Sequence, residues 1–202
     1  MSILPAAVRS PCHRVRPALR LLAAVLLAVA APGAGGLWPA GGAALAAAVR
    51  PLGESDALPP VPAGEPVLTV ESGGRSEALT YADIERLPMS ETTLETPWLP
   101  KATWQGVSLL ELLDRYGLGK ARTLVMTALD GYAIRLDRAA IEAGNPLLAT
   151  RRDGAPVPVG QRGPLMVLWP QSAEAVKAGS AASANWIWSL SSIRSGDGGD
   201  TP

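Results

Sequence analysis

Residues 104–113 read Trp-Gln-Gly-Val-Ser-Leu-Leu-Glu-Leu-Leu and carry a strong helix signal in this chain of 202 residues. Ser108 can cap a helix, and Glu111 stands three residues later, which is the spacing of a capping box. Four leucines follow Ser108 at helical spacing, and Gly117 supplies a stop signal. The stretch therefore predicts a short helix whose apolar face packs on a core.

Short strands, turns and further helices are predicted on both sides of this helix. Thr80 to Leu87 starts with Thr-x-x-Asp and predicts a helix. Asp130-Gly131 and Asp153-Gly154 are turn signals, and Asp137 can cap a helix that ends at Gly144. Strands are expected at 67–70, 92–96, 123–129, 132–136, 147–151 and 165–169, and in the alternating run 186–190. This mixture of meandering strands and short helices predicts an α+β domain.

The N-terminus has the features of a secretory signal peptide. Four arginines precede an apolar run at residues 21–31, and no acidic residue occurs before Glu54. The small-residue site Ala44-Leu45-Ala46 follows, so cleavage is expected near residues 46 to 48, with export to the periplasm. An uncleaved membrane anchor stays open as the alternative, although two prolines and five glycines interrupt the apolar extension after residue 31.

Proline-rich sequence and a polar tail flank the predicted domain. The block 49–66 contains five prolines and little periodic hydrophobicity, which predicts an extended linker rather than a folded element. The tail 195–202 is polar and rich in glycine, and is expected to be disordered. The predicted organisation is a signal peptide at 1–48, the linker, one domain at 67–194 and the tail.

Export would change both the charge and the chemistry of the chain. The sequence has 18 basic and 18 acidic side chains, and removal of residues 1–48 leaves 14 and 18, a net charge of −4. Nucleic acid is therefore not expected as a partner, because phosphate binding needs clustered Lys and Arg. Cys12 and His13 are the only residues of their kinds, and both lie in the signal segment. The exported part therefore cannot form a disulfide, a thiolate or imidazole metal site, or a nucleophile system based on His or Cys.

Five short motifs follow one another from Trp104 to Ile193. They are W-Q-G-V-S-L-L-E-L-L at 104–113, A-L-D-G-Y-A-I-R-L at 128–136, L-L-A at 147–149 with D-G-A-P-V at 153–157, G-P-L-M-V-L-W-P at 163–170 and W-I at 186–187. In this order and spacing they resemble the molybdopterin-binding domain of the sulfite oxidase superfamily, especially its short exported bacterial members. The resemblance implies a mixed β-sheet with short helices, oxidoreductase chemistry and a molybdopterin cofactor.

The resemblance also identifies positions where this chain departs from the family. Relatives that carry the cofactor hold molybdenum through a cysteine thiolate, in the segment that here spans 92–98 and has no sulfur. The histidine, arginine and lysine that contact the pterin in the family correspond to Gln161, Met166 and Asn185. These residues are poor substitutes, because molybdenum prefers a soft thiolate and the pterin phosphate prefers Arg and Lys donors.

What remains is a vestigial pocket, and the roles of its residues stay open. Tyr132 matches the tyrosine that lies over the substrate in catalytic relatives, or else is a half-buried strand residue. Trp98 and Trp104 line the place of the pterin, or else fill the core of a chain that has no Phe. The pocket candidates are Thr96, Trp98, Trp104, Gln161, Arg162 and Asn185.

Three arginines are a further candidate site. Arg151, Arg152 and Arg162 form an anion-binding patch if their loops converge. Otherwise they form a solvated, charge-balancing surface. This alternative is favoured because charged residues are usually exposed.

Two functions stay open from the sequence. The first is an exported, cofactor-free module that binds a small molecule or a protein partner in the periplasm. The second is a molybdopterin-dependent oxidoreductase with non-cysteine ligation, through Thr96, Glu95 or a partner chain. The combined loss of the thiolate and the basic pterin contacts favours the first, and whether the chain is an enzyme is left undecided. An uncleaved signal segment would tether either form to a membrane.

Overall fold

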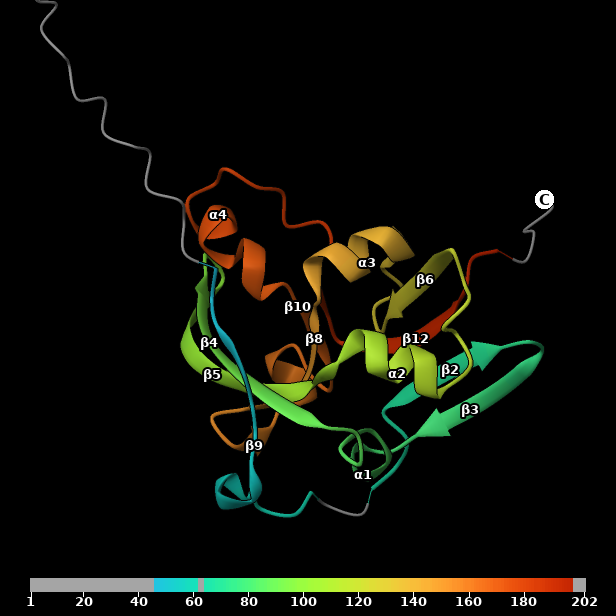
Figure 1. The fold of residues 1–202 in the computed structure, drawn as a ribbon, viewed down its shortest axis with the longest axis horizontal. Helices are drawn as coiled ribbons and strands as arrows, with labels where there is room; N and C mark the ends of the chain where they lie inside the picture. Colours follow the sequence, from blue (N-terminus) through green and yellow to red (C-terminus); the bar gives the residue numbers. More distant parts are fainter. Residues whose placement is uncertain (1–45, 62–63, 198–202) are drawn as a thin grey trace, which may run out of the picture. The chain divides into compact units, whose positions relative to one another are not determined.

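Two β-sheets and four short α-helices make up residues 46–61 and 64–197, the part of the chain that this computed structural model describes (Figure 1). The predicted signal peptide, with its alternative as a membrane anchor, falls mainly on residues 1–45, which lie outside the described residues. Within the two described ranges, no helix is long and apolar enough to cross a membrane.

The first sheet has the strand order β1-β4-β5-β8-β10-β11, and β9 pairs with β8 beside this path. All of its strand pairs are antiparallel. The strands are β1 (Val49–Pro51), β4 (Met89–Thr96), β5 (Leu99–Ser108), β8 (Leu147–Arg152), β9 (Ala155–Pro156), β10 (Met166–Leu168) and β11 (Ile187–Trp188). Because β5 and β8 are central, the Trp104–Ser108 half of the opening motif is a buried strand rather than part of the helix.

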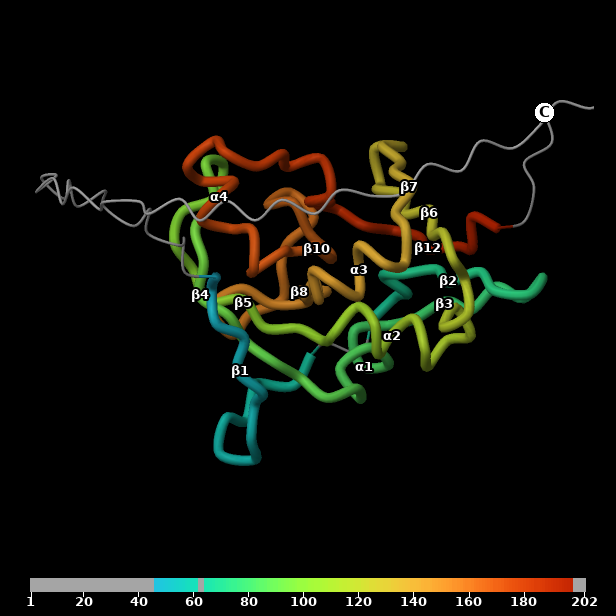
Figure 2. Tube along the Cα trace, turned by 45° about the horizontal axis from the view of Figure 1, so that its top comes forward, coloured from blue at the N-terminus to red at the C-terminus, as the bar shows by residue number. Residues whose placement is uncertain are grey.

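The second sheet has the order β3-β2-β12-β6-β7. Figure 2 shows β12 between β2 and β6, where it runs parallel to β2 and antiparallel to β6. The strands are β2 (Leu68–Ser72), β3 (Arg75–Leu79), β6 (Thr123–Ala128), β7 (Ala133–Asp137) and β12 (Leu190–Ser195). The parallel pair makes this sheet mixed, which confirms the predicted α+β class.

The helices pack against one core that both sheets share. They are α1 (Tyr81–Ile84), α2 (Leu109–Arg115), α3 (Arg138–Gly144) and α4 (Ala173–Lys177), with 3-10 turns at Glu54–Asp56, Val159–Gln161 and Pro170–Ser172. Three leucines of α2 are fully buried, as their spacing predicts. Ser108 occupies the N-cap position, but its side chain caps no backbone N–H, so the predicted capping box at this helix is wrong.

The capping box of α1 is formed as predicted and makes stability depend on pH. The Thr80 hydroxyl donates to Asp83 Oδ2 at 2.6 Å, and the Thr80 N–H donates to the same oxygen at 3.0 Å. These two bonds hold the pKa of Asp83 below its ordinary value of 3.8. The folded state therefore favours the ionised carboxylate. Its contribution to the free energy of unfolding is complete above the ordinary pKa of Asp and is lost as pH falls through the lowered pKa.

We therefore expect Asp83→Asn to reduce the loss of stability in acid. Urea midpoints measured from neutral pH to well below 3.8 should fall less for the variant than for the parent chain. An equal fall in both proteins would mean that this carboxylate does not contribute to the acid sensitivity.

The block 49–66 is not only the extended linker that its prolines predict. Strand β1 pairs with the edge of β4, and the two run side by side in Figure 2. Arg50 bridges Asp56 and Glu91 at 2.7 Å each, so ion pairs add to the backbone ladder. Pro51 is tolerated because β1 is an edge strand, where a missing N–H costs no ladder bond.

Two boundaries at the C-terminal end also differ from the sequence prediction. The run 186–190 is not one strand, because Ser189 has a φ of 55° and sends β11 and β12 into different sheets. The tail is ordered up to Asp197, whose carboxylate accepts the N–H groups of Arg122 and Thr123 at 2.6 and 3.0 Å. The remaining tail residues, 198–202, lie outside the described residues.

Candidate functional site

A cavity of about 320 Å³ lies where the β6–β7 turn faces the loop that leads into β11. This volume is at the lower end of the range for small-molecule sites, about 300–1,000 Å³. Its lining residues are Ala128, Asp130, Tyr132, Ser183, Ala184, Trp186 and Trp188. An apolar wall with a few polar groups is the usual composition of a ligand pocket.

The β6–β7 turn presents Asp130 and Tyr132 to this cavity. Gly131 has a φ of 85°, and Asp130 Oδ1 accepts the Tyr132 N–H at 2.9 Å, so the turn chemistry is as predicted. Tyr132 precedes β7 rather than lying within a strand, and 48% of its surface is exposed. Its hydroxyl donates to the carbonyl of Ala184, another lining residue, at 3.4 Å.

A cluster of tryptophans forms the opposite wall. Trp186 is 4% exposed and Trp188 is 37% exposed, and the Trp98 ring lies 6.1 Å and 6.0 Å from theirs. Arg162 donates to the Trp98 carbonyl at 3.1 Å, and its guanidinium carbon lies 5.5 Å from the Trp188 ring centroid. The structure thus brings Trp98 and Arg162, two of the predicted pocket residues, against the back of the cavity wall.

The other four predicted pocket residues lie elsewhere, so none of the six candidates is itself part of the cavity lining. Trp104 is 0% exposed in the middle of β5, which is its predicted alternative role as core filler. Gln161 is exposed in a 3-10 turn. Asn185 contributes its backbone carbonyl, which accepts the Trp169 indole N–H at 2.7 Å. Thr96 ends β4 with its side chain buried.

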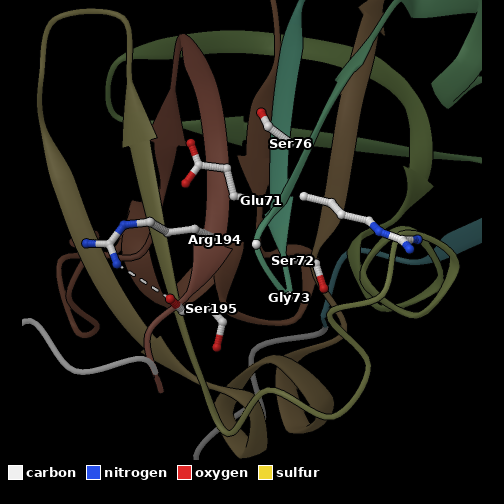
Figure 3. A pocket seen from close by; sticks show the side chains of 8 residues that line it. Glu71, Ser72, Gly73, Ser76, Arg194 and Ser195 are labelled. Carbon is white, nitrogen blue, oxygen red and sulfur yellow. Dashed lines mark hydrogen bonds between the residues drawn. The ribbon is translucent and has the colours of Figure 1, made fainter.

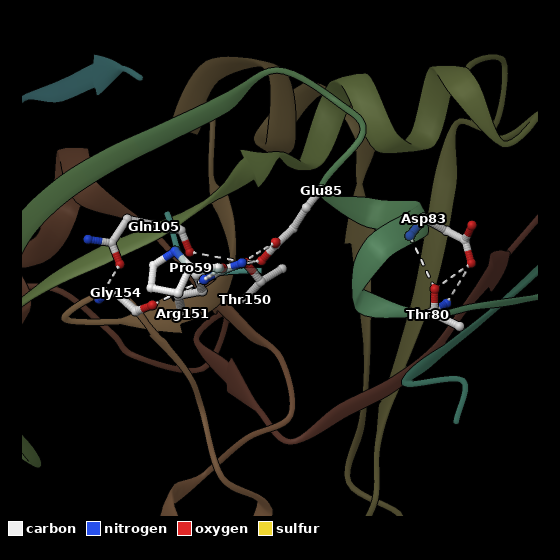
Figure 4. A network of polar contacts seen from close by, with 8 residues as sticks. All are labelled: Pro59, Thr80, Asp83, Glu85, Gln105, Thr150, Arg151 and Gly154. Carbon is white, nitrogen blue, oxygen red and sulfur yellow. Dashed lines mark hydrogen bonds and ion pairs between the residues drawn. The ribbon is translucent and has the colours of Figure 1, made fainter. Parts of the chain in front are cut away.

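Arg151 is neither part of an anion patch nor solvated, which corrects both predictions for it. It is 2% exposed and binds Glu85 through two bonds, Nη2 to Oε2 at 2.7 Å and Nε to Oε1 at 2.9 Å (Figure 4). Its Nη1 donates to the carbonyls of Pro59 and Gly154, and the Thr150 hydroxyl donates to Glu85. This ion pair therefore ties the end of α1 and the proline-rich block to β8, and no local sequence pattern predicts it.

A larger hollow of about 570 Å³ lies beside the β2–β3 turn. Figure 3 shows Glu71 and Arg194 extending from neighbouring strands there, with Ser72 and Gly73 at the turn. Arg194 Nη1 donates to the Ser195 carbonyl at 3.5 Å. None of the described residues that line this hollow is aromatic, so it lacks the apolar wall of the cavity at Tyr132.

Residues 61–190 match the family model of the oxidoreductase molybdopterin binding domain. The chain belongs to this family. A comparison with curated proteins gives no match. Among solved structures, the sulfane dehydrogenase SoxCD from Paracoccus pantotrophus is similar, with 15% identity and a TM-score of 0.48 over 63% of this chain. The aligned part spans 37% of that chain, so this protein covers just over a third of its length.

The residues of this oxidoreductase molybdopterin binding domain do not fit the cofactor that its family binds. The core-facing side chains at the end of β4 are Thr92, Leu94 and Thr96, in the segment where relatives place the thiolate. Met166, at the position of a pterin-contacting arginine, is fully buried and pairs with Trp188 across β10 and β11. Within the described ranges no three His, Cys, Asp or Glu residues are grouped to hold a metal ion.

Of the cavity residues, sequence reasoning identified Tyr132 and missed Asp130, Trp186 and Trp188 as site residues. Asp130 is predicted only as a turn former, Trp186 only as a motif residue and Trp188 only as part of an alternating strand. Their juxtaposition depends on the turn at Ser189, which directs β11 and β12 to different sheets. A run of alternating residues carries no signal for such a break, because Ser is not a typical residue for positive φ.

Proposed function

We propose that this chain is an exported, cofactor-free member of the oxidoreductase molybdopterin binding domain family, and that it binds a small ligand in the cavity at Tyr132. Its fold belongs to the redox family, while its site offers an aromatic pocket instead of metal and pterin donors. The basic and then apolar N-terminal sequence supports export to the periplasm. N-terminal sequencing of the recovered protein checks this part, with a new terminus expected near residues 46 to 48.

The donor set at the end of β4 carries the proposal. Molybdenum in the family is held by a thiolate, and the core-facing groups here are two hydroxyls and a leucine. The basic pterin contacts are replaced by Gln161, Met166 and Asn185, none of which carries a positive charge. An anionic pterin phosphate would lose its charge-assisted bonds at each of these positions.

One observation favours the alternative, a molybdopterin-dependent oxidoreductase with non-cysteine ligation. Thr96 Oγ1 is buried and has no hydrogen-bond partner among the described residues, so it is free to act as an oxygen ligand. The second predicted ligand, Glu95, is instead paired with Lys177 at 2.7 Å. Thr92 Oγ1 is also buried without a hydrogen-bond partner among the described residues. An unpaired buried hydroxyl on β4 is therefore not specific to the expected ligand position.

Thr96→Val separates the two functions. If no metal is bound, the substitution removes an unpaired buried hydroxyl, and we expect the free energy of unfolding to rise by about 1 kcal/mol. Thr92→Val is the matched control and should act in the same direction, because its hydroxyl is in the same condition. If Thr96 is a ligand, the variant should instead lose bound molybdenum and stability together. Urea denaturation and metal content of both variants provide the readout.

A pair of expression strains tests the proposal without any variant. The full chain is produced in a host that makes molybdopterin and in an otherwise identical host that does not. A cofactor that binds only the folded state raises its stability, so equal melting temperatures are expected from the two hosts. A higher melting temperature from the molybdopterin-producing host would contradict cofactor loss.

A further inference from the structure

We propose that the cavity at Tyr132 selects small cations that carry a methylated ammonium group. This inference rests on the proposed function, since it names the ligand class of the same cavity. It follows from the charge of the lining and from its aromatic walls.

The charge of the lining is negative. Of the described residues that line the cavity, Asp130 is the only one with an ionic side chain, and Lys and Arg are missing from the set. Asp130 uses Oδ1 to accept the Tyr132 N–H, which fixes the carboxylate beside the cavity. Asp130 is exposed, so water screens part of its attraction for a cation, and the aromatic walls must supply the rest.

The walls suit a cation rather than a neutral apolar group. Tyr132, Trp186 and Trp188 contribute aromatic side chains to the lining. The electron-rich faces of such rings attract ammonium groups, and an aromatic cage is the usual recognition site for quaternary ammonium. Methyl groups on the nitrogen increase the apolar contact and lower the cost of removing the cation from water.

One cation, Arg162, already lies against a ring of this wall, so a ligand cation gains the attraction of Asp130 and of the rings only net of repulsion from this guanidinium. The Arg162 guanidinium lies 5.5 Å from the Trp188 ring centroid, and Arg162 is outside the lining. Its Nη1 is held by the Trp98 carbonyl at 3.1 Å, so the arginine is fixed at the back of the wall. Ala184 also contributes to the lining. Its backbone carbonyl accepts the Tyr132 hydroxyl.

Isothermal titration with choline tests the ligand class on the full chain. The matched probe is the neutral isostere of choline, in which a tert-butyl group replaces the trimethylammonium group. Because the two have the same shape, the difference isolates the charge, and we expect choline to bind at least about fivefold more tightly.

Three variants locate the effect. Asp130→Asn keeps a side-chain oxygen that can accept the Tyr132 N–H and removes only the charge, so the preference for choline should fall to the part that the aromatic walls supply. Trp188→Leu keeps an apolar wall without the ring and should weaken choline several-fold while leaving the isostere less affected. Glu111→Gln removes one negative charge from an exposed position on α2, away from the cavity lining, and should keep the preference.

The outcomes separate this inference from the proposed function. Equal binding of choline and its isostere would overturn the cation preference and leave a ligand-binding cavity. A preference that is undiminished in Asp130→Asn, or is reduced equally in Glu111→Gln, would also overturn it. If neither probe binds, the inference fails, while cofactor loss is decided independently by the molybdenum content of the protein.

Discussion

Gly106→Ala is expected to prevent the chain from folding or to destabilise it by about 3 kcal/mol or more. Gly106 lies in the buried centre of β5, where a bulge with Gln105 shifts the register against β8. An added Cβ would fall well inside contact distance of the Leu148 carbonyl oxygen and 2.7 Å from Cα of Ala149. Both obstacles are backbone atoms of the paired strand, so no side-chain rotation can relieve the overlap.

Gly160→Ala is the control for this substitution. A Cβ at Gly160 meets nothing within 4 Å, and the residue is exposed in the 3-10 turn before Arg162. Its urea midpoint should stay close to that of the parent chain, while Gly106→Ala should be recovered as insoluble or weakly cooperative protein. A Gly106→Ala variant with the parent's midpoint would show that β5 and β8 are not in close contact.

Arg151→Met is expected to cost about 3–5 kcal/mol, because it leaves Glu85 buried without its partner. The Glu85 side chain is 11% exposed, and it receives three of the bonds in the network. The carbonyls of Pro59 and Gly154 lose a donor as well. Because Pro59 belongs to the proline-rich block, we expect this block to become sensitive to proteases in the variant.

Lys177→Met breaks an ion pair of the same length in an exposed place and serves as the control. Lys177 Nζ lies 2.7 Å from Glu95 Oε2, and about two fifths of each side chain is exposed. Water screens such a pair, so little change in the urea midpoint is expected. If the two variants lose equal stability, burial is not what makes the Arg151 pair important.

The fold could be predicted from the sequence where local chemistry determines it. The capping box at Thr80, the Asp-Gly turns and the leucine spacing after Ser108 each have a mechanism that works within a few residues. The ordered motifs added the family and its mixed sheet. Strand β1 was missed because its stability comes from pairing with β4 and from the Arg50–Glu91 ion pair, both of which join distant parts of the chain.

The candidate site was predicted less well, for a related reason. Tyr132, Trp98 and Arg162 were predicted from the family resemblance, and they lie at or behind the cavity wall. Asp130 and Trp188 join them only because the β6–β7 turn meets the start of β11 in space. The burial of Arg151 could not be predicted either, since its partner Glu85 is 66 residues away.

Cofactor loss is tested most directly by mass spectrometry of the native full chain, purified after export from a host that makes molybdopterin. A member of the same family that retains the cysteine, produced in the same host, provides the positive control. We expect the mass of the polypeptide alone, with neither molybdenum nor pterin. Molybdenum and pterin near one per chain would contradict the proposal and would require a working oxidoreductase with a different ligand set.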